Sequence, residues 1–477
     1  MTDTLAPSTT APGLVDTAGE LSGAALTRRV LAAARALHER GIRAGDRALV
    51  KGDNSVDYVV ALLALMHLDV SLVPVDHRQS AADVRDAARR TRARWLLTDG
   101  PADEAFPADR VLRHAGLGTG AAPDDAEVDL GRWYARTDAV VLWSSGTTGR
   151  PKGIVKSGRA VRGNTLRTIR AMGYRADDVL APLLPFSHQY GLSVVLLWWL
   201  AGCTLVVTPY QRVDVAVARA VAHGVTAVDA APSTYHTLLG VLRRRPELRA
   251  GLANVRLWGV GGAPLPAPLA AAFTAAVGRP LLDGYGLTEL GNVALATPDE
   301  PTGCGRPLPG VEVRVVTADG REAAAGELGG IEVRSPDLME GYLRDDGTVS
   351  PVAHDAWYPT EDLGRVDSAG RLQVVGRNRA VHRLGFTLYP ESLERKAEAC
   401  GRPVKVLPAQ DRRRGCVLHF VVADPQDTPP AEWRRRLAPH LADYEQPNAV
   451  HVVPDFPLNP NGKVDTRALR SMLGLPS

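Results

Sequence analysis

The sequence is poor in cysteine, and this excludes two kinds of site. Its 477 residues include four cysteines, Cys203, Cys304, Cys400 and Cys416, and no two of them form a CxxC pair. Structural zinc sites and disulfide frameworks both need clustered cysteines. We therefore expect neither, and a reducing cytoplasm suits this composition.

An excess of charge of one sign is also missing. The 56 Lys and Arg residues nearly balance the 53 Asp and Glu residues, which leaves a net charge of +3. Binding to nucleic acid usually requires a strongly basic surface, so no nucleic-acid partner is expected. The first residues, 1–14, lack a basic segment followed by an apolar core, so no signal peptide is predicted.

Long hydrophobic runs are scarce, and only residues 190–207 approach the length of a membrane span. Gly202 interrupts this run, and the β-branched residues beyond it favour a strand. We predict a buried helix, a tight turn and a buried strand here, and no membrane span.

What the sequence does contain is a regular alternation of helices and short apolar strands. Such alternation predicts an α/β fold with largely parallel sheets, here as two similar units in succession. Residues 101–129 are rich in Ala, Gly, Asp and Pro and are predicted to be a surface loop. The predicted helices span residues 26–40, 56–68, 81–91, 213–224, 235–244 and 267–277, and the predicted strands span 47–50, 71–75, 95–98, 139–143, 179–184, 225–228 and 255–262.

The pattern changes after residue 301. Alternating apolar and polar residues predict half-exposed strands at 310–316 and 330–334, and thus a β-rich subdomain. From about residue 377 the chain is predicted to form a small α+β unit, and about 100 residues suffice for a separate domain. Its predicted helices span 390–399 and 431–441, and its predicted strands span 416–423 and 449–453.

A glycine- and hydroxyl-rich segment follows the predicted strand at 139–143. Glycines let successive backbone N–H groups point toward one centre, and such a nest of donors binds anions. An ordinary Gly/Thr-rich turn has a similar composition. The order of residues does not fit a Walker A loop, because the lysine stands between Pro and Gly. The segment is Ser144, Ser145, Gly146, Thr147, Thr148, Gly149, Arg150, Pro151, Lys152 and Gly153.

Four further segments hold residues suited to nucleotide chemistry. In 283–289, read as a turn, Tyr285 stands between glycines and can lie against a planar base, and Glu289 can hold Mg²⁺. In 357–364, read as a loop, Asp362 can accept hydrogen bonds from two ribose hydroxyls. The last two are Gly376-Arg377 and a C-terminal segment that contains Lys463, for which a solvated turn is the simpler interpretation.

In this order, the five segments resemble the motifs of the adenylate-forming (AMP-binding) superfamily: acyl- and aryl-CoA synthetases, peptide-synthetase adenylation domains and luciferases. The resemblance covers about residues 20 to 470. It implies an α/β protein with a large N-terminal domain (1–376) of two α/β subdomains and a β subdomain. A small mobile α+β domain (377–477) follows.

The resemblance also implies the reaction and its residues. A carboxylate attacks the α-phosphorus of ATP, giving an acyl-adenylate and pyrophosphate, with Mg²⁺ as the metal. The implied catalytic residues are Lys152, Thr288, Glu289 (also the metal ligand) and Lys463, and the implied hinge is Arg379. The implied nucleotide-binding residues are Ser144, Ser145, Gly146, Thr147, Thr148, Gly149, Gly262, Ala263, Asp283, Gly284, Tyr285, Asp362 and Arg377.

The acid pocket is implied by the same resemblance. Amino-acid-activating relatives carry an Asp after the Phe of this segment, but Ser187 follows Phe186 here, so an α-amino acid is disfavoured. His188 resembles the histidine of acyl- and aryl-CoA ligases, although a packed core histidine is a simpler interpretation. An aromatic or hydrophobic acid is expected. The implied pocket residues are Phe186, His188, Gln189, Ala231, Gly261, Gly286 and Leu290.

Three positions depart from the superfamily pattern. Glu361 replaces a glycine of the ribose motif, and in the segment that concerns the second half of the reaction Arg379 replaces an Asp or Lys and 385–391 is one residue short. The acceptor can therefore be a thiol, from coenzyme A or the phosphopantetheine of a separate carrier protein, or else an amine. A third interpretation, a non-catalytic nucleotide-binding protein, is disfavoured because Glu289 and Lys463 are both present. A monomer or homodimer is expected.

Overall fold

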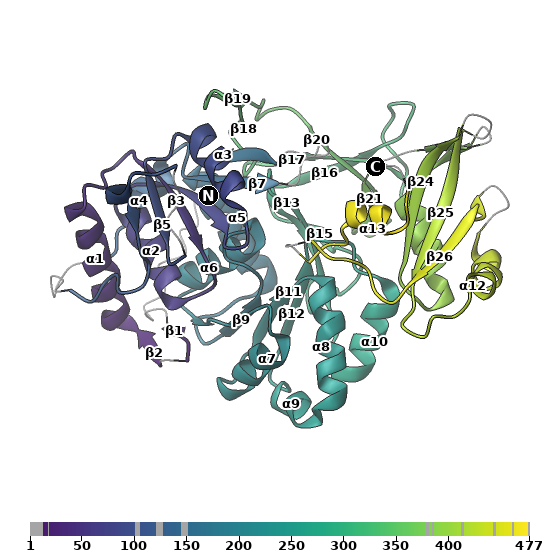
Figure 1. Ribbon diagram of the computed structural model, residues 1–477, viewed down its shortest axis with the longest axis horizontal. Coiled ribbons are helices and arrows are strands. Elements are labelled where there is room, and N and C mark those ends of the chain that lie inside the picture. Colours follow the sequence, from purple (N-terminus) through teal and green to yellow (C-terminus); the bar gives the residue numbers. More distant parts are fainter. Residues whose placement is uncertain are drawn as a thin grey trace.

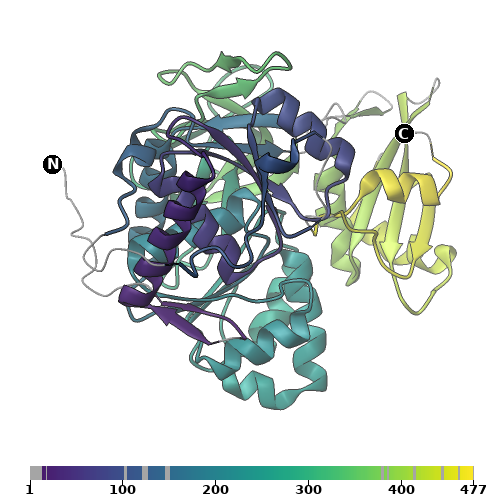
Figure 2. The same ribbon diagram turned by 60° about the vertical axis from the view of Figure 1, so that its left-hand side comes forward.

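The computed structural model describes residues 13–17, 19–100, 105–120, 127–144, 151–377, 381–383, 386–411, 415–441, 445–459 and 462–475. Figure 1 shows a large lobe formed by the N-terminal three quarters of the chain and a smaller lobe formed by its C-terminal end. Figure 2, turned by 60°, shows the smaller lobe to one side of the larger.

The first sheet of the large lobe has eight strands in the order β19-β18-β8-β7-β4-β3-β5-β6. The five strands from β7 to β6 are parallel, and β8, β18 and β19 extend the sheet antiparallel. The strands are β3 (Arg47–Gly52), β4 (Ser71–Asp76), β5 (Trp95–Thr98), β6 (Val111–Leu112), β7 (Val140–Ser144), β8 (Lys152–Lys156), β18 (Gly341–Leu343) and β19 (Val349–Pro351).

The second sheet has nine strands in the order β15-β14-β13-β12-β11-β9-β10-β1-β2. Its central strands, from β13 to β1, are parallel. The strands are β1 (Gly13–Val15), β2 (Glu20–Ser22), β9 (Val179–Leu183), β10 (Thr204–Val206), β11 (Ala227–Ala230), β12 (Leu257–Gly261), β13 (Leu282–Leu287), β14 (Gly291–Leu295) and β15 (Arg306–Pro307).

Helices separate the two sheets and cover their outer faces. Leu72 of β4 and Leu205 of β10 belong to one buried core, which also contains residues of the intervening helices. Val73, next along β4, points to the opposite face and packs under α3, as the alternation of a strand requires. The intervening helices are α1 (Gly23–Glu39), α2 (Val56–His67), α4 (Gly131–Ala135), α5 (Gly158–Met172) and α6 (Gln189–Ala201), and the outer helices are α3 (Ala81–Thr91), α7 (Val213–Ala222), α8 (Pro232–Arg244), α9 (Pro246–Gly251) and α10 (Ala267–Val277).

The N-terminal strand joins the two halves of the large lobe. β1 pairs in parallel with β10 of the second sheet, with Gly13 opposite Thr204, before the chain enters the first sheet. The indole N–H of Trp198 donates to the carbonyl of Gly13 over 2.7 Å, which fixes this crossing.

The β subdomain is a four-stranded antiparallel sheet in the order β16-β17-β20-β21. Its core includes Ile331 and Val333 of the second strand, and it also contains Tyr285 of β13, so the subdomain packs directly on the second sheet. The strands are β16 (Glu312–Val316), β17 (Gly329–Arg334), β20 (Tyr358–Val366) and β21 (Leu372–Arg377).

The small lobe has its own core around Phe420 and Trp433. The predicted domain boundary after residue 376 stays a prediction. The elements of the lobe are β22 (Val381–Arg383), β23 (Phe386–Leu388), α11 (Pro390–Ala397), β24 (Val404–Asp411), β25 (Gly415–Ala423), α12 (Pro430–Leu437), β26 (Ala449–Val453) and α13 (Thr466–Met472), with short 3₁₀ turns at Glu398–Cys400 and Ala438–His440 in the lobe and at Ala108–Arg110 in the large lobe.

The α/β class is confirmed, but not every element is. The segment 190–207 forms α6, a left-handed turn at Gly202, and β10, as predicted. In the described part of the chain, no helix is long and apolar enough to cross a membrane. The strand predicted at 225–228 lies instead at Ala227–Ala230, and 101–129 contains β6 in addition to loops.

Candidate active site

Three neighbouring strands of the second sheet end at the same edge. β11, β12 and β13 run in parallel side by side, so their carboxyl ends meet there. The residues just beyond these ends are 231–233, 262–263 and 288–289, which include Ala231, Gly262, Ala263, Thr288 and Glu289. The sheet therefore brings predicted pocket, adenine and metal residues together at one edge.

The predicted phosphate loop leaves the first sheet between two paired strands. β7 and β8 are antiparallel, and Ser144 stands opposite Lys152 in register. The Lys152 ammonium lies 5.3 Å from the centre of the Tyr342 ring, a cation–π contact. Ser145, Gly146, Thr147, Thr148, Gly149 and Arg150 lie outside the described residues.

The segment around Tyr285 is strand β13, not the predicted turn, and Asp362 lies in β20, not in a loop. The Tyr285 hydroxyl donates to a carboxylate oxygen of Asp362 over 2.7 Å, and both residues are buried. Asp362 stands opposite Arg377 of β21 in register. The structure thus brings together three predicted nucleotide-binding residues, Tyr285, Asp362 and Arg377. The first two are 77 positions apart in the sequence.

A bulge in β20 positions Asp362. The register between β17 and β20 shifts between Gly330 and Glu332 of β17, opposite the segment that contains Asp362. Glu361 there has a φ of 60°, a left-handed conformation that costs a non-glycine residue about 1–2 kcal/mol. The glycine that the superfamily carries here would adopt this conformation without strain.

This strain predicts a stability difference between two variants. Glu361→Gly and Glu361→Ala both lose the carboxylate, but only glycine relieves the left-handed strain. The free energy of unfolding of Glu361→Gly should therefore exceed that of Glu361→Ala by about 1 kcal/mol. Urea denaturation measures this difference. Equal stabilities would show that the bulge relaxes without glycine.

Glu289 has fixed neighbours on both its side chain and its backbone. Its carboxylate accepts from the Tyr342 hydroxyl over 3.3 Å, and that hydroxyl lies 2.7 Å from the Tyr358 hydroxyl. Its carbonyl accepts from the ammonium of Lys156 over 3.2 Å. Burial lowers the pKa of Lys156 to about 8. One carboxylate beside the hydroxyl of Thr288 offers the hard oxygen ligands that Mg²⁺ shares with phosphates, so these residues fit that ion.

Asp283 lies beneath the same edge in β13. The Cys304 thiol donates to its carboxylate over 3.4 Å, and burial raises the pKa of Asp283 to about 6. Arg395 of α11 reaches the large lobe and donates to the carbonyl of Val374. The small lobe therefore contacts the strands that carry the candidate nucleotide site.

The C-terminal motif contacts the edge from the other lobe. Asn459 closes its turn: its N–H donates to the carbonyl of Lys463 over 2.7 Å, and its side-chain oxygen accepts from the Lys463 N–H over 3.0 Å. A β-carbon placed on Gly462 would lie 2.9 Å from the Ser233 hydroxyl, at the start of α8. The exposed Lys463 thus belongs to a turn that packs directly beside the carboxyl end of β11.

His188 has an acidic partner that the sequence did not reveal. Its Nε2 lies 3.3 Å from a carboxylate oxygen of Asp76, the last residue of β4. Asp76 also accepts two hydrogen bonds from the Arg78 guanidinium, over 3.0 and 3.1 Å. Burial alone would raise the pKa of Asp76, but the contacts with His188 and Arg78 outweigh it and hold this pKa well below its usual range. The sequence signal that could have revealed Asp76 is an acidic residue at the carboxyl end of a buried parallel strand, where ligand sites lie in open α/β sheets.

The other predicted pocket residues differ in burial. Phe186 and Leu290 are buried in hydrophobic cores, whereas Gly286 is exposed. The side-chain oxygen of Gln189 is buried, and within the described ranges no donor reaches it. The predicted hinge, Arg379, lies outside the described residues.

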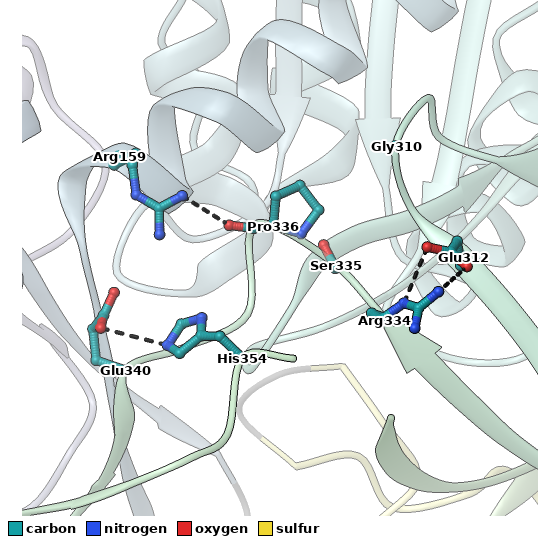
Figure 3. A pocket seen from close by; sticks show the side chains of 8 residues that line it. All are labelled: Arg159, Gly310, Glu312, Arg334, Ser335, Pro336, Glu340 and His354. Carbon is teal, nitrogen blue, oxygen red and sulfur yellow. Dashed lines mark hydrogen bonds and ion pairs between the residues drawn. The ribbon is translucent and has the colours of Figure 1, made fainter. Parts of the chain in front are cut away.

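A surface cavity of about 460 Å³ lies elsewhere, and Figure 3 shows its lining. None of its lining residues belongs to the predicted site. Its charges face one another: Arg334 pairs with Glu312, and His354 lies 3.5 Å from Glu340. Arg159 donates to the carbonyl of Pro336 over 3.3 Å. Each of these charged or polar side chains therefore has a partner within the lining.

The fold and the arrangement of the motifs define an ATP-dependent ligase of the adenylate-forming class. A model of the AMP-binding enzyme family matches residues 4–343, and the chain belongs to that family. It is accordingly an acyl-CoA synthetase-like enzyme that uses ATP and Mg²⁺.

Individual relatives span nearly the whole chain. A 3-[(3aS,4S,7aS)-7a-methyl-1,5-dioxo-octahydro-1H-inden-4-yl]propanoyl:CoA ligase from Mycobacterium tuberculosis is 30% identical, over 93% of this chain and 92% of its own length. The fatty acid–[acyl-carrier-protein] ligase ScoC from Streptomyces coeruleorubidus is 29% identical, over 92% and 88%. ATP-bound MatB from Rhodopseudomonas palustris has a TM-score of 0.86 and 26% identity, over 98% of this chain and 96% of that one.

Proposed function

We propose that the protein activates a non-amino carboxylic acid, aromatic or hydrophobic, as its acyl-adenylate and then transfers the acyl group to a thiol. The observation that supports this most directly is the shared edge of β11, β12 and β13, because the turn with Lys463 packs beside it and Tyr285 of β13 binds Asp362. The thiol belongs to coenzyme A or to the phosphopantetheine of a separate carrier protein. The similarity to a CoA ligase and to a carrier-protein ligase supports both acceptors.

The nucleotide is held, in this proposal, by the paired strands of the β subdomain and by β13. Asp362 and Arg377 hold the ribose hydroxyls. The hydrogen bond from Tyr285 to Asp362 fixes the tyrosine ring, which frames the adenine together with Gly262, Ala263 and Asp283. Bond formation then relies on positioning and on neutralisation of charge.

The phosphates and the acid carboxylate need positive charge. Lys152 and the loop that precedes it hold the β- and γ-phosphates, and Thr288 donates to the α-phosphate. Glu289 would hold Mg²⁺, which neutralises phosphate charge. Lys463 lies on the turn beside Ser233, from which it neutralises the charge that develops as the carboxylate attacks.

His188 lies at the carboxylate end of the acid pocket. A carboxylate oxygen of Asp76 lies 3.3 Å from its Nε2, so the two side chains form an ion pair when the imidazole is protonated. No acidic side chain follows Phe186, so an α-amino group would find no partner in that segment. These two features support a non-amino acid. We further propose that the protein acts in the cytoplasm, as a monomer or homodimer.

The test is pyrophosphate release over a panel of aryl, fatty and α-amino acids, with product mass spectrometry in the presence of coenzyme A, holo-carrier protein or an amine. We expect the highest kcat/KM with an aryl or hydrophobic acid and a thioester product. An amide product would favour the amine acceptor. Release only with α-amino acids, or with no acid, would refute the proposal.

A further inference from the structure

A carboxylate without a cationic partner lies buried on the strand next to the candidate pocket. Asp229, in the apolar strand β11, is 7% exposed. Its two oxygens accept from the hydroxyls of Tyr190, over 2.8 Å, and Tyr174, over 3.3 Å. Throughout the described ranges, no Lys, Arg or His forms an ion pair with it, and its hydrogen-bonding partners are the two tyrosines. A buried acid of this kind is costly unless further donors reach it.

The cluster of Asp229, Tyr190 and Tyr174 adjoins the segments that the resemblance assigns to the substrate pocket. Tyr190 is the second residue of α6, two positions after His188, and Ala231 follows β11. Two glycines of β12 face the cluster: a β-carbon on Gly259 would lie 2.3 Å from a carboxylate oxygen of Asp229, and one on Gly261 would lie 3.3 Å from the Tyr190 ring. Glycine at both positions is what allows Tyr190 and Asp229 to lie against this strand.

The carboxylate retains capacity for further hydrogen bonds. An ionised carboxylate offers about four lone-pair sites, and the two tyrosine hydroxyls occupy two. Burial raises the pKa of Asp229, while the hydrogen bonds from Tyr190 and Tyr174 oppose this effect. The buried, unsatisfied oxygen of Gln189 supplies a second acceptor on the first turn of the same helix. A plain alkyl chain would leave such acceptors without donors.

We infer that Asp229 is a specificity-determining residue, and that the acid activated here carries an N–H or O–H donor at the end remote from its carboxylate. This inference rests on the proposed function and names the substrate class: hydroxylated or amino-substituted aryl acids. His188 then marks the carboxylate end of the substrate and Asp229 its donor end. A pocket built to hydrogen-bond a substrate discriminates strongly against the analogue that lacks the donor.

The test compares acids of nearly equal size that differ in the donor. Pyrophosphate release is measured with 4-hydroxycinnamate against 4-methylcinnamate, and with 4-aminobenzoate against 4-methylbenzoate. The native protein should prefer the donor-bearing acid of at least one pair by about tenfold or more in kcat/KM. Equal use of both acids in each pair, or preference for the methyl acids, would overturn the inference.

Asp229→Asn should reduce that preference about tenfold, and Asp229→Leu should reverse it. The ratio of two acids on one protein sample does not depend on the folded fraction, so a structural defect alone would leave it unchanged. Asp299→Asn, at an exposed carboxylate after β14, is the matched control and should leave the ratio and both rates unchanged. An equal loss with both acids in Asp229→Asn would contradict the assignment. If the native protein releases no pyrophosphate with any acid, the proposed function itself fails.

Discussion

Lys463→Ala is expected to lower acid-dependent pyrophosphate release by about 10²–10³-fold, the usual effect of removing one donor that stabilises developing charge. The turn that carries Lys463 packs beside Ser233 at the carboxyl end of β11, and Asn459 holds it closed through backbone groups that the substitution keeps. The loss should therefore appear in kcat. The equilibrium dissociation constant of ATP should change by less than about threefold, because ground-state contacts remain.

The control lies four residues further on. Arg467 is also exposed and cationic, at the start of α13, and Arg467→Ala should retain activity within about twofold. Both variants should keep the native stability, since exposed substitutions change it by about 0.5 kcal/mol or less. Normal turnover in Lys463→Ala would refute the role proposed for this lysine.

Asp362→Ala should raise the KM for ATP by about 10²-fold or more. In the proposed role, its carboxylate accepts hydrogen bonds from two ribose hydroxyls, and each bond to a charged group contributes about 1.5–3 kcal/mol. The substitution also removes the acceptor of the 2.7 Å hydrogen bond from the buried Tyr285 hydroxyl, so the free energy of unfolding should fall by about 1–3 kcal/mol. Steady-state kinetics and denaturant titration measure the two effects separately.

Tyr285→Phe separates ribose binding from the tyrosine–aspartate hydrogen bond. This variant keeps the carboxylate and the aromatic ring but loses the 2.7 Å hydrogen bond. Its KM for ATP should rise by only about 3- to 10-fold, equivalent to one ordinary hydrogen bond. If it were as impaired as Asp362→Ala, the carboxylate would act mainly by holding the tyrosine.

Local sequence patterns were sufficient for most of the fold. The helices at 81–91 and 267–277 and the strands at 95–98 and 449–453 have the predicted bounds. Helix α5, in contrast, was not predicted. It buries Asn164, Thr165 and Thr168 along with apolar residues, so its inward face lacks a clear hydrophobic period.

The motifs were readable from sequence, but their partners were not. The sequence predicts a loop around Asp362, whereas pairing with β17 and β21 holds that segment in a strand. Asp76 and Asp229 each end or interrupt an apolar strand, yet their partners, His188 and Tyr190, are 112 and 39 positions away. Only the packing of strands and helices into layers brings such residues together.

The parallel pairing of β1 with β10 also constrains how the chain matures during synthesis. Gly13 cannot reach its neighbour until Thr204 has left the ribosome, 191 residues later. At a translation rate of roughly 5–20 residues per second, β1 remains unpaired with β10 for about 10–40 s after its own synthesis. The first sheet is completed later still, because its edge strands β18 and β19 lie at residues 341–351. The two halves of the large lobe are therefore expected to mature as one unit, and a split of the chain between them would leave each half without a strand that the other supplies.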